Sequence, residues 1–165
     1  MDVTNCRKMT DEKVVKLFSE KNLVFIATIM KDGSPQVSPV WANYEDGFIL
    51  VNTAEGRIKH KNILRDPRVA VSVTSNDNPL DMTTIRGKVI EIISDADYSH
   101  ADKLTQQYMG RPNYPFKQEN EKRIILKIKP EKILFYLSCR CLIDLHLWIY
   151  NISKFEFRNI VYLIR

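Results

Sequence analysis

The feature that most constrains this chain is a succession of short β-rich segments joined by tight turns. Residues 22–30, NLVFIATIM, are apolar and rich in β-branched side chains, and an Asp-Gly pair at 32–33 separates them from a second extended segment, residues 35–44. Asp-Gly between two apolar runs is a strong β-hairpin signal. A second turn at 45–47 leads into residues 48–53. Consecutive strands joined in this way predict an antiparallel sheet.

The rest of the chain predicts three more strands and three short helices. The strands are expected at residues 68–74, 82–92 and 123–137, with a bend or bulge at Gly87 and a break at Pro130. Helices are expected at residues 10–22, within 52–69 before the Asp66-Pro67 pair, and at 94–110, the last capped by Ser94 or Asp95 and ended by Gly110. Six strands with two or three helices favour a mainly β fold, a closed or split antiparallel barrel.

Two prolines set the second strand apart from the others. Pro35 and Pro39 lack the backbone N–H that a central strand donates to its neighbours. One side of this strand is therefore expected to be free or irregular.

The last 28 residues, 138–165, differ from the rest of the chain. Their apolar residues alternate as in a strand, but no chemistry is evident in them. We treat residues 1–137 as one domain and residues 138–165 as a C-terminal extension of unclear role. The extension could form an extra hairpin, a partner surface, or a segment outside the fold.

Composition limits the function classes. The chain has 165 residues, enough for one domain with a core of its own, and a net charge of +5. This excess is modest and suits any anionic ligand, so it is weak support for nucleic-acid binding. We expect no signal peptide and no membrane span, because the N-terminus carries early acids and no long apolar run occurs. Three cysteines form no disulfide framework, which favours a cytoplasmic location.

Motifs for hydrolytic or metal chemistry are not found. The three histidines, His60, His100 and His146, form no metal-ligand spacing, and none adjoins a recognisable nucleophile. We expect His100 at the surface, because its predicted helix is polar. No metal site is predicted.

The stretch NTAEGRIKHKNILRDPRV, residues 52–69, is the strongest candidate for a binding site. A strand ends at Thr53, Gly56 follows, and a helix opens with Arg57, Lys59 and Lys61. The first N–H groups of a helix lack partners and carry partial positive charge, so phosphate is a natural ligand there. A helical wheel places Lys59 with Asn62 on one face, away from Arg57 and Lys61. On these residues alone, a solvated basic helix is an equally good interpretation.

The ordered motifs of residues 10–137 resemble a known family. They are an AT…DG.P…PVW hairpin from residue 27, a T..G..K..N…DPRV helix from residue 53, an RG.V strand at 86–89 and a Y.G…YP segment at 108–115. This set is similar to the pyridoxamine 5'-phosphate oxidase-like family of FMN-binding split barrels. Within the family, the chain looks most like the branch that uses the deazaflavin coenzyme F-420.

The resemblance implies a six-stranded antiparallel split barrel that forms a homodimer, with the cofactor at the subunit interface. Lys59 matches the lysine that holds the cofactor phosphate, with Thr53, Asn52 and, less directly, Arg57 beside it. The strand that lines the ring is matched by Gln36, Val37, Ser38, Pro39, Val40 and Trp41. Met82 and Thr83 match a position near the ring, and Tyr108 and Tyr114 match a segment that contacts substrate or comes from the second subunit.

The function implied by the resemblance is an oxidoreductase. A hydride would pass between the bound cofactor, coenzyme F-420 in preference to FMN, and a small organic substrate. A non-catalytic flavin or deazaflavin carrier is the second reading, and a basic nucleic-acid-binding domain is the third. The sequence identifies no catalytic residue.

Overall fold

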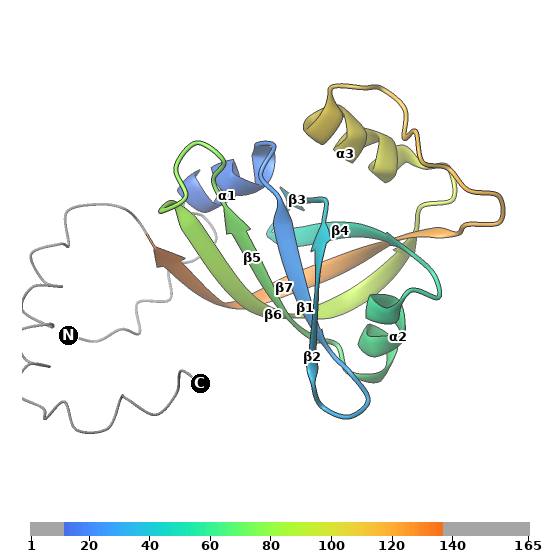
Figure 1. Cartoon of the computed structure of the whole chain (residues 1–165), viewed down its shortest axis with the longest axis horizontal. Coiled ribbons are helices and arrows are strands. Elements are labelled where there is room, and N and C mark those ends of the chain that lie inside the picture. The colour runs from blue at the N-terminus through green and yellow to red at the C-terminus, as the bar shows by residue number, and fades with distance from the viewer. Residues whose placement is uncertain (1–11, 137–165) are drawn as a thin grey trace, which may run out of the picture.

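The computed structural model describes residues 12–136, which form a curled antiparallel sheet with three helices (Figure 1). The mainly β, antiparallel fold that the sequence predicts is confirmed. The strands are seven rather than six, and they follow the order β2-β1-β5-β6-β7-β4-β3. In chain order the elements are α1 (Glu12–Ser19), β1 (Val24–Ile29), β2 (Pro35–Val40), β3 (Ala42–Glu45), β4 (Phe48–Ala54), α2 (Ile58–Arg65), β5 (Arg68–Thr74), β6 (Met82–Ser94), α3 (Ser99–Met109) and β7 (Arg123–Tyr136).

The additional strand arises at Trp41. The expected single strand 35–44 is two strands, β2 and β3, and they lie at opposite edges of the sheet. Since only Trp41 separates them, the two edges must meet there, and the sheet curls into a half-barrel. The predicted free side of the proline-bearing strand is confirmed, because β2 pairs only with β1 in the chain described.

The turns and the bulge follow the sequence prediction. Gly33, with φ of 85°, closes the β1–β2 hairpin, and Gly47, with φ of 88°, closes the β3–β4 hairpin. The register of β6 and β7 shifts between Arg86 and Gly87. A Cβ on Gly87 would lie 2.3 Å from the carbonyl oxygen of Lys129, so only glycine fits this close approach. The break predicted at Pro130 is wrong, because β7 continues through this bulge to Tyr136.

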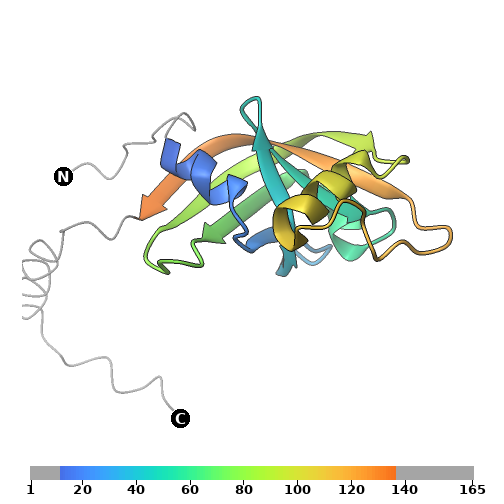
Figure 2. The ribbon, with the colours of Figure 1, turned by 90° about the horizontal axis from the view of Figure 1, so that it is seen from above.

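The apolar core fills the inside of the half-barrel. It consists of alternate side chains from the strands, closed by Val14, Leu17 and Phe18 of α1 and by Ile63 of α2. Seen from above, α1 and α3 both lie across the strands on one side of the sheet (Figure 2). No side chain of α3 belongs to this core.

The helix limits differ from the predicted ones in two helices, and the first of them, α1, ends at Ser19 rather than at residue 22. The predicted end of α2 before Asp66-Pro67 and of α3 before Gly110 are both confirmed. The start of α3 is Ser99 rather than residue 94, because β6 continues through Ser94. Asp95 nevertheless serves as a cap, since its carboxylate accepts the backbone N–H groups of His100 (2.9 Å) and Ala101 (3.1 Å).

Two further sequence predictions concern the C-terminal extension and membrane-spanning segments. The proposed extension 138–165 lies outside the described residues. Among residues 12–136, none of the helices has the length and hydropathy that crossing a membrane requires.

Candidate functional site

A cavity of about 300 Å³ opens where the two edges of the sheet meet. Its wall combines β-strand ends, the start of α2, the buried face of α3 and the segment before β7. The lining residues are Leu23, Pro39, Val40, Trp41, Asn52, Thr53, Arg57, Lys59, Ala101, Leu104, Tyr114, Phe116 and Arg123. The site is therefore cationic at one end and apolar or aromatic at the other.

Three cations define the polar end, and only one of them has no counter-ion. Arg57 pairs with Glu121 at 2.7 Å, and Arg123 lies 3.4 Å from the same carboxylate. Lys59 makes no ion pair or hydrogen bond with any described residue. Burial lowers the pKa of Lys59 below its usual value, and the neighbouring charges of Arg57 and Arg123 lower it further. An anion bound here would relieve this repulsion.

Thr53 leaves a polar atom unsatisfied in the wall of the cavity. The residue is 2% exposed, and its Oγ1 is one of two buried side-chain polar atoms without a hydrogen-bond partner in the described region. Buried hydroxyls are nearly always paired, since an unpaired one costs about 1–3 kcal/mol. A ligand acceptor in the cavity would satisfy it.

The start of α2 is likewise open. Arg57 occupies the N-cap position, and its side chain makes no capping hydrogen bond. The first-turn N–H groups therefore remain available beside Lys59 and Thr53. The predicted separation of Arg57 from Lys59 is wrong, because Arg57 precedes the helix and both residues line the cavity.

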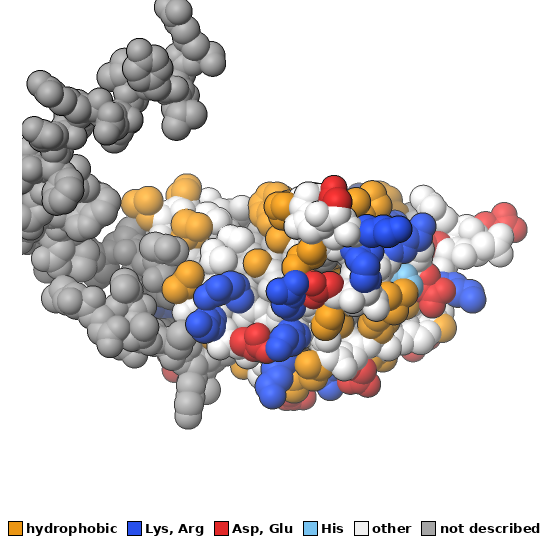
Figure 3. Space-filling model, turned by 90° about the horizontal axis from the view of Figure 1, so that it is seen from below, with side chains coloured by type: hydrophobic (Ala, Val, Ile, Leu, Met, Phe, Trp, Pro, Cys, Tyr) orange, Lys and Arg blue, Asp and Glu red, His pale blue; other side chains and the backbone are white. Residues whose placement is uncertain are grey.

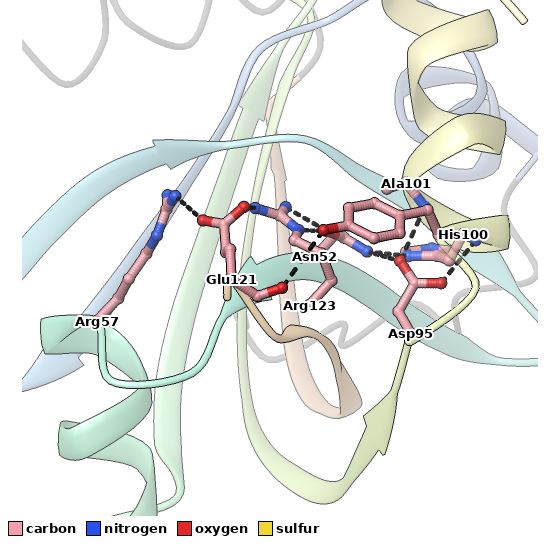
Figure 4. Close-up of polar contacts among 8 residues, drawn as sticks. Asn52, Arg57, Asp95, His100, Ala101, Glu121 and Arg123 are labelled. Carbon is pink, nitrogen blue, oxygen red and sulfur yellow. Dashed lines mark hydrogen bonds and ion pairs between the residues drawn. The ribbon is translucent and has the colours of Figure 1, made fainter. Parts of the chain in front are cut away.

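A buried polar network fixes Arg123 behind the cavity (Figure 4). The Nε and Nη2 groups of Arg123 both donate to Oδ1 of Asn52, the first at 2.8 Å. Nδ2 of Asn52 donates to Asp95 at 2.7 Å and contacts Nδ1 of His100 at 3.1 Å. Both the oxygen and the NH₂ group of the Asn52 amide are thus hydrogen-bonded within the network. The sequence predicts Asn52 beside a cofactor phosphate, whereas in the structure its side chain holds Arg123 in place.

The network requires His100 to be neutral. Since Asn52 must present its oxygen to Arg123, its NH₂ group faces Nδ1 of His100, which can only accept. Nε2 then donates to Oδ1 of Asn43 at 2.9 Å. Burial lowers the pKa of His100 to about 4, which agrees with this tautomer. The prediction that His100 lies at the surface is wrong, because it is only 6% exposed.

Aromatic side chains form the other end of the cavity. Trp41 stacks on Tyr108 with ring centroids 5.3 Å apart, and Tyr114 meets Trp41 edge-on at 6.4 Å. Tyr114 also lies under the guanidinium of Arg123, at 4.9 Å from the ring centroid. Stacked and edge-on aromatic pairs suit the wall of a flat ligand ring.

The structure brings together eight of the fourteen residues that the sequence singles out. These line the cavity: Pro39, Val40, Trp41, Asn52, Thr53, Arg57, Lys59 and Tyr114. Tyr114 lines the cavity of its own chain, whereas Tyr108 stacks on Trp41 and its hydroxyl lies 3.0 Å from the backbone oxygens of Asn22 and Ala42, one of which accepts its single proton. Their contact with substrate or with the site of a second subunit stays a prediction.

The other predicted residues lie away from this wall. Gln36 contacts Thr28 at 3.1 Å, and Val37 is 58% exposed on the edge strand. Ser38 has a buried Oγ with no described partner. Met82 and Thr83 start β6, where Thr83 donates to the backbone oxygen of Leu134 at 3.0 Å. Their proximity to a cofactor ring remains a prediction.

Sequence reasoning missed Arg123, Glu121, Asp95 and His100. They come from two distant segments that meet only through the β4–β7 and β6–β7 pairings. The sequence signal for Arg123 was weak, because it is one of five charged residues of β7, with Lys127, Lys129, Glu131 and Lys132.

The donor set fits the phosphate of a flavin-type cofactor. An unpaired ammonium, an unpartnered hydroxyl and the open start of a helix meet at one end of a cavity whose other end is aromatic. Phosphate binds such helix starts and cations, and apolar walls suit the ring. Within residues 12–136, no group of three metal-ligating side chains could hold a metal ion.

A curled antiparallel half-barrel with this cavity at its meeting edges is the architecture of a split barrel. The chain belongs to the pyridoxamine 5'-phosphate oxidase family, whose model matches residues 10–137. The resemblance predicted from the sequence is thereby confirmed.

Individual relatives give narrower comparisons. The solved structure of an F-420 reductase is 28% identical, with a TM-score of 0.66 over 72% of this chain and 94% of that chain. A protein of Lactobacillus delbrueckii described as a putative pyridoxamine 5'-phosphate oxidase is 23% identical, with a TM-score of 0.55 over 79% of this chain and 97% of that one, and it shows the fold alone. An uncharacterized protein of Methanocaldococcus jannaschii is 38% identical over 72 residues, 41% of this chain and 47% of that protein. This match spans about half the length of that relative.

Proposed function

We propose that the chain is an oxidoreductase that binds a flavin-type cofactor in this cavity, coenzyme F-420 in preference to FMN, and acts on a small organic substrate. The observation that carries the proposal is that two residues without described partners line one cavity. Lys59 has no counter-ion among the described residues, and the buried hydroxyl of Thr53 has no hydrogen-bond partner there. Family membership and the similarity to an F-420 reductase support it.

The residues of the chain bind and orient the cofactor. Lys59, Thr53 and the start of α2 would hold the phosphate, while Pro39, Val40 and Trp41 would lie along the ring. Hydride transfer is the chemistry that a flavin-type group supplies when it is bound. The apolar wall of Leu104, Tyr114 and Phe116 would exclude water from the ring and leave one face for the substrate.

A second copy of the chain is part of the proposal. The cavity of about 300 Å³ is at the small end for a cofactor site and opens at its edge. Next to it, Leu23, Phe25 and Val37 are exposed by 43%, 43% and 58%. Phe25 is paired across the strands with Pro39, so this apolar surface continues into the cavity wall. A homodimer would cover it and enlarge the site.

The test is a fluorescence titration of the protein with FMN and with coenzyme F-420, side by side. Replacing Lys59 with Ala should weaken binding by about 1.5–3 kcal/mol, the range for a hydrogen bond to a charged group. Lys61→Ala is the matched control, because Lys61 is exposed on the same helix and does not line the cavity. Binding of neither cofactor to the wild-type protein would overturn the proposal.

A non-catalytic carrier of the same cofactor is the alternative function. It has the same binding site and differs only in chemistry, because a fold does not fix a reaction. Tight binding without turnover of the reduced cofactor, against a panel of small acceptors, would favour the carrier.

Nucleic-acid binding has less support. On the outer face of the sheet, lysine and arginine side chains are interspersed with acidic and apolar ones (Figure 3). Among the described cations, Arg68 is paired with Asp66 at 2.6 Å and Lys88 with Glu131 at 3.0 Å. Such a mixed surface lacks the continuous basic stripe that phosphate backbones require.

A further inference from the structure

Arg123 is a buried guanidinium with hydrogen-bonding capacity left over. The residue is 6% exposed, and it lines the cavity from the first position of β7, opposite Ala54. Its Nε and Nη2 donate to Asn52, and Nη1 lies 3.4 Å from Glu121. A guanidinium has five N–H donors, so two have no acceptor among the described residues.

Hydrogen bonds with other buried side chains fix the position of Arg123. Asn52 accepts two of its N–H groups, and Asn52 is itself held by Asp95 and His100. Asp95 is in turn anchored to the backbone N–H groups at the start of α3. The ring of Tyr114 covers one face of the guanidinium. A donor group held this firmly is prepared for a ligand before the ligand arrives.

Charge points to the kind of ligand. Arg57 and Arg123 share the carboxylate of Glu121, and Lys59 pairs with no described carboxylate, so cationic N–H groups in the cavity lack an anionic partner. A phosphate monoester carries a charge of about −1.5 to −2 near neutral pH. Lys59 and Arg123 line the same cavity, whereas Thr53, opposite Ile124 in the register, has its side chain on the other face of the β4–β7 ladder from Arg123 and Asn52.

We propose that Arg123 is a ligand-binding residue that contacts the anionic group held by Lys59, and that Asn52 is its positioning residue. Glu121 competes with the anion, because its carboxylate pairs with Arg57 and with Nη1 of Arg123 when no anion is bound. The existence of the anion site stands on these contacts alone. The identity of its ligand as a flavin-type cofactor rests on the proposed function.

The test uses inorganic phosphate as the probe, with calorimetry and the shift in melting temperature at fixed ionic strength. Arg123→Gln should weaken phosphate binding about 10- to 100-fold, as expected for a lost charge-assisted contact. Glu121→Gln, which removes the competing charge and keeps the shape, should tighten it. Arg86→Gln is the control, because Arg86 is exposed on β6 and does not line the cavity. Unchanged binding in Arg123→Gln, or no binding to the wild-type protein, overturns the proposal.

Two further variants guard against a folding defect. If Arg123→Gln does not fold, Arg123→Lys keeps the charge and loses the fork, and it should still weaken binding while Glu121→Gln tightens it. Asn52→Leu tests the positioning role of Asn52. If Asn52 acts through Arg123, the losses of phosphate affinity in Asn52→Leu and Arg123→Lys should be non-additive in the double variant. Additive losses would show that Asn52 does not act through Arg123.

A parallel titration with FMN and coenzyme F-420 separates this inference from the proposed function. Phosphate binding that depends on Arg123, without binding of either cofactor, would overturn the flavin-type function and support the anion site. Cofactor binding that is unaffected by Arg123→Gln and Glu121→Gln would support the function and overturn the role of Arg123.

Discussion

The half-barrel core and the wall of the cavity are held together by different forces. Every side chain in the core cluster is apolar, and it draws on α1, α2 and the strands. The helix α3, which forms one wall of the cavity, contributes nothing to that cluster. It buries Ala101 and Leu104, and it is also attached by hydrogen bonds from His100 to Asn43, from Gln107 to the backbone of Phe18, and from the hydroxyl of Tyr108 to a backbone oxygen of Asn22 or Ala42. The fold's stability should therefore reside in the core, and the geometry of the site in the polar wall.

The largest effect on stability should come from the core. Ile85 on β6 is fully buried, and Ile85→Ala should lower the free energy of unfolding by about 2–5 kcal/mol through lost burial and a cavity. Ile90 on the same strand is 51% exposed at the second β6–β7 register shift, so Ile90→Ala should cost far less. Urea denaturation measures both. The folded Ile85→Ala protein should bind phosphate as the wild type does; a parallel loss of binding would show that core and wall are not separable.

This division explains what the sequence could and could not predict. The hairpin at Asp32-Gly33, the helix stop at Asp66-Pro67 and the bulge at Gly87 are local signals, and the structure confirms all three. The core follows from apolar periodicity. The wall leaves a weaker pattern, because α3 buries the polar side chains of His100 and Thr105 beside the apolar Ala101 and Leu104.

The site was predictable only where it is contiguous in sequence. Thr53 and Lys59 lie six positions apart, and the order of strand, glycine and helix places them together. Arg123 joins them from 64 positions further along the chain through the β4–β7 pairing. The split at Trp41 was missed because propensity does not tell which edge of a sheet a strand joins. The roles of these residues toward a cofactor stay predictions.

Acid should break the wall before the core. The pKa of His100 is lowered by burial to about 4, from 6.5 in the unfolded chain. Between these values the unfolded state binds more protons, so stability is full above pH 6.5 and falls as the pH drops towards 4. The loss is about 3 kcal/mol on this shift. Burial is the main cause, and protonation would also bring an N–H at Nδ1 against the NH₂ group of Asn52.

Denaturation at pH 7, 6, 5 and 4 measures this slope. In His100→Gln, the free energy of unfolding should fall less between pH 6.5 and pH 4, because the contribution of His100 is absent. A slope that is the same in the variant would mean that other groups cause the acid sensitivity, and the neutral His100 would lose its place in the network.

A smaller effect is expected where α3 meets the Trp41 corner. The hydroxyl of Tyr108 donates to a backbone oxygen and receives the N–H of Ala42 at 3.3 Å, while its ring stacks on Trp41. Tyr108→Phe keeps the stacking and removes the hydroxyl, so it should cost about 1 kcal/mol. Amide hydrogen exchange should show faster exchange at Ala42 than at core positions of β6. Uniform acceleration throughout the sheet would place Tyr108 with the core instead.

The smallest effect on stability should be opposite in sign. Burial lowers the pKa of Lys59, so in the pH range below its unfolded value the charged amine is less favourable in the folded state than in the unfolded one. Lys59→Met keeps the apolar stem and removes the charge, and it should leave the anion-free protein as stable as the wild type or up to about 1 kcal/mol more stable. With saturating phosphate the order should reverse, because only the wild type gains the binding energy of the anion. Melting curves with and without phosphate decide this. A variant that is less stable in both conditions would assign Lys59 to the structure of the wall, and a residue with that role would not be the group that holds the cofactor phosphate.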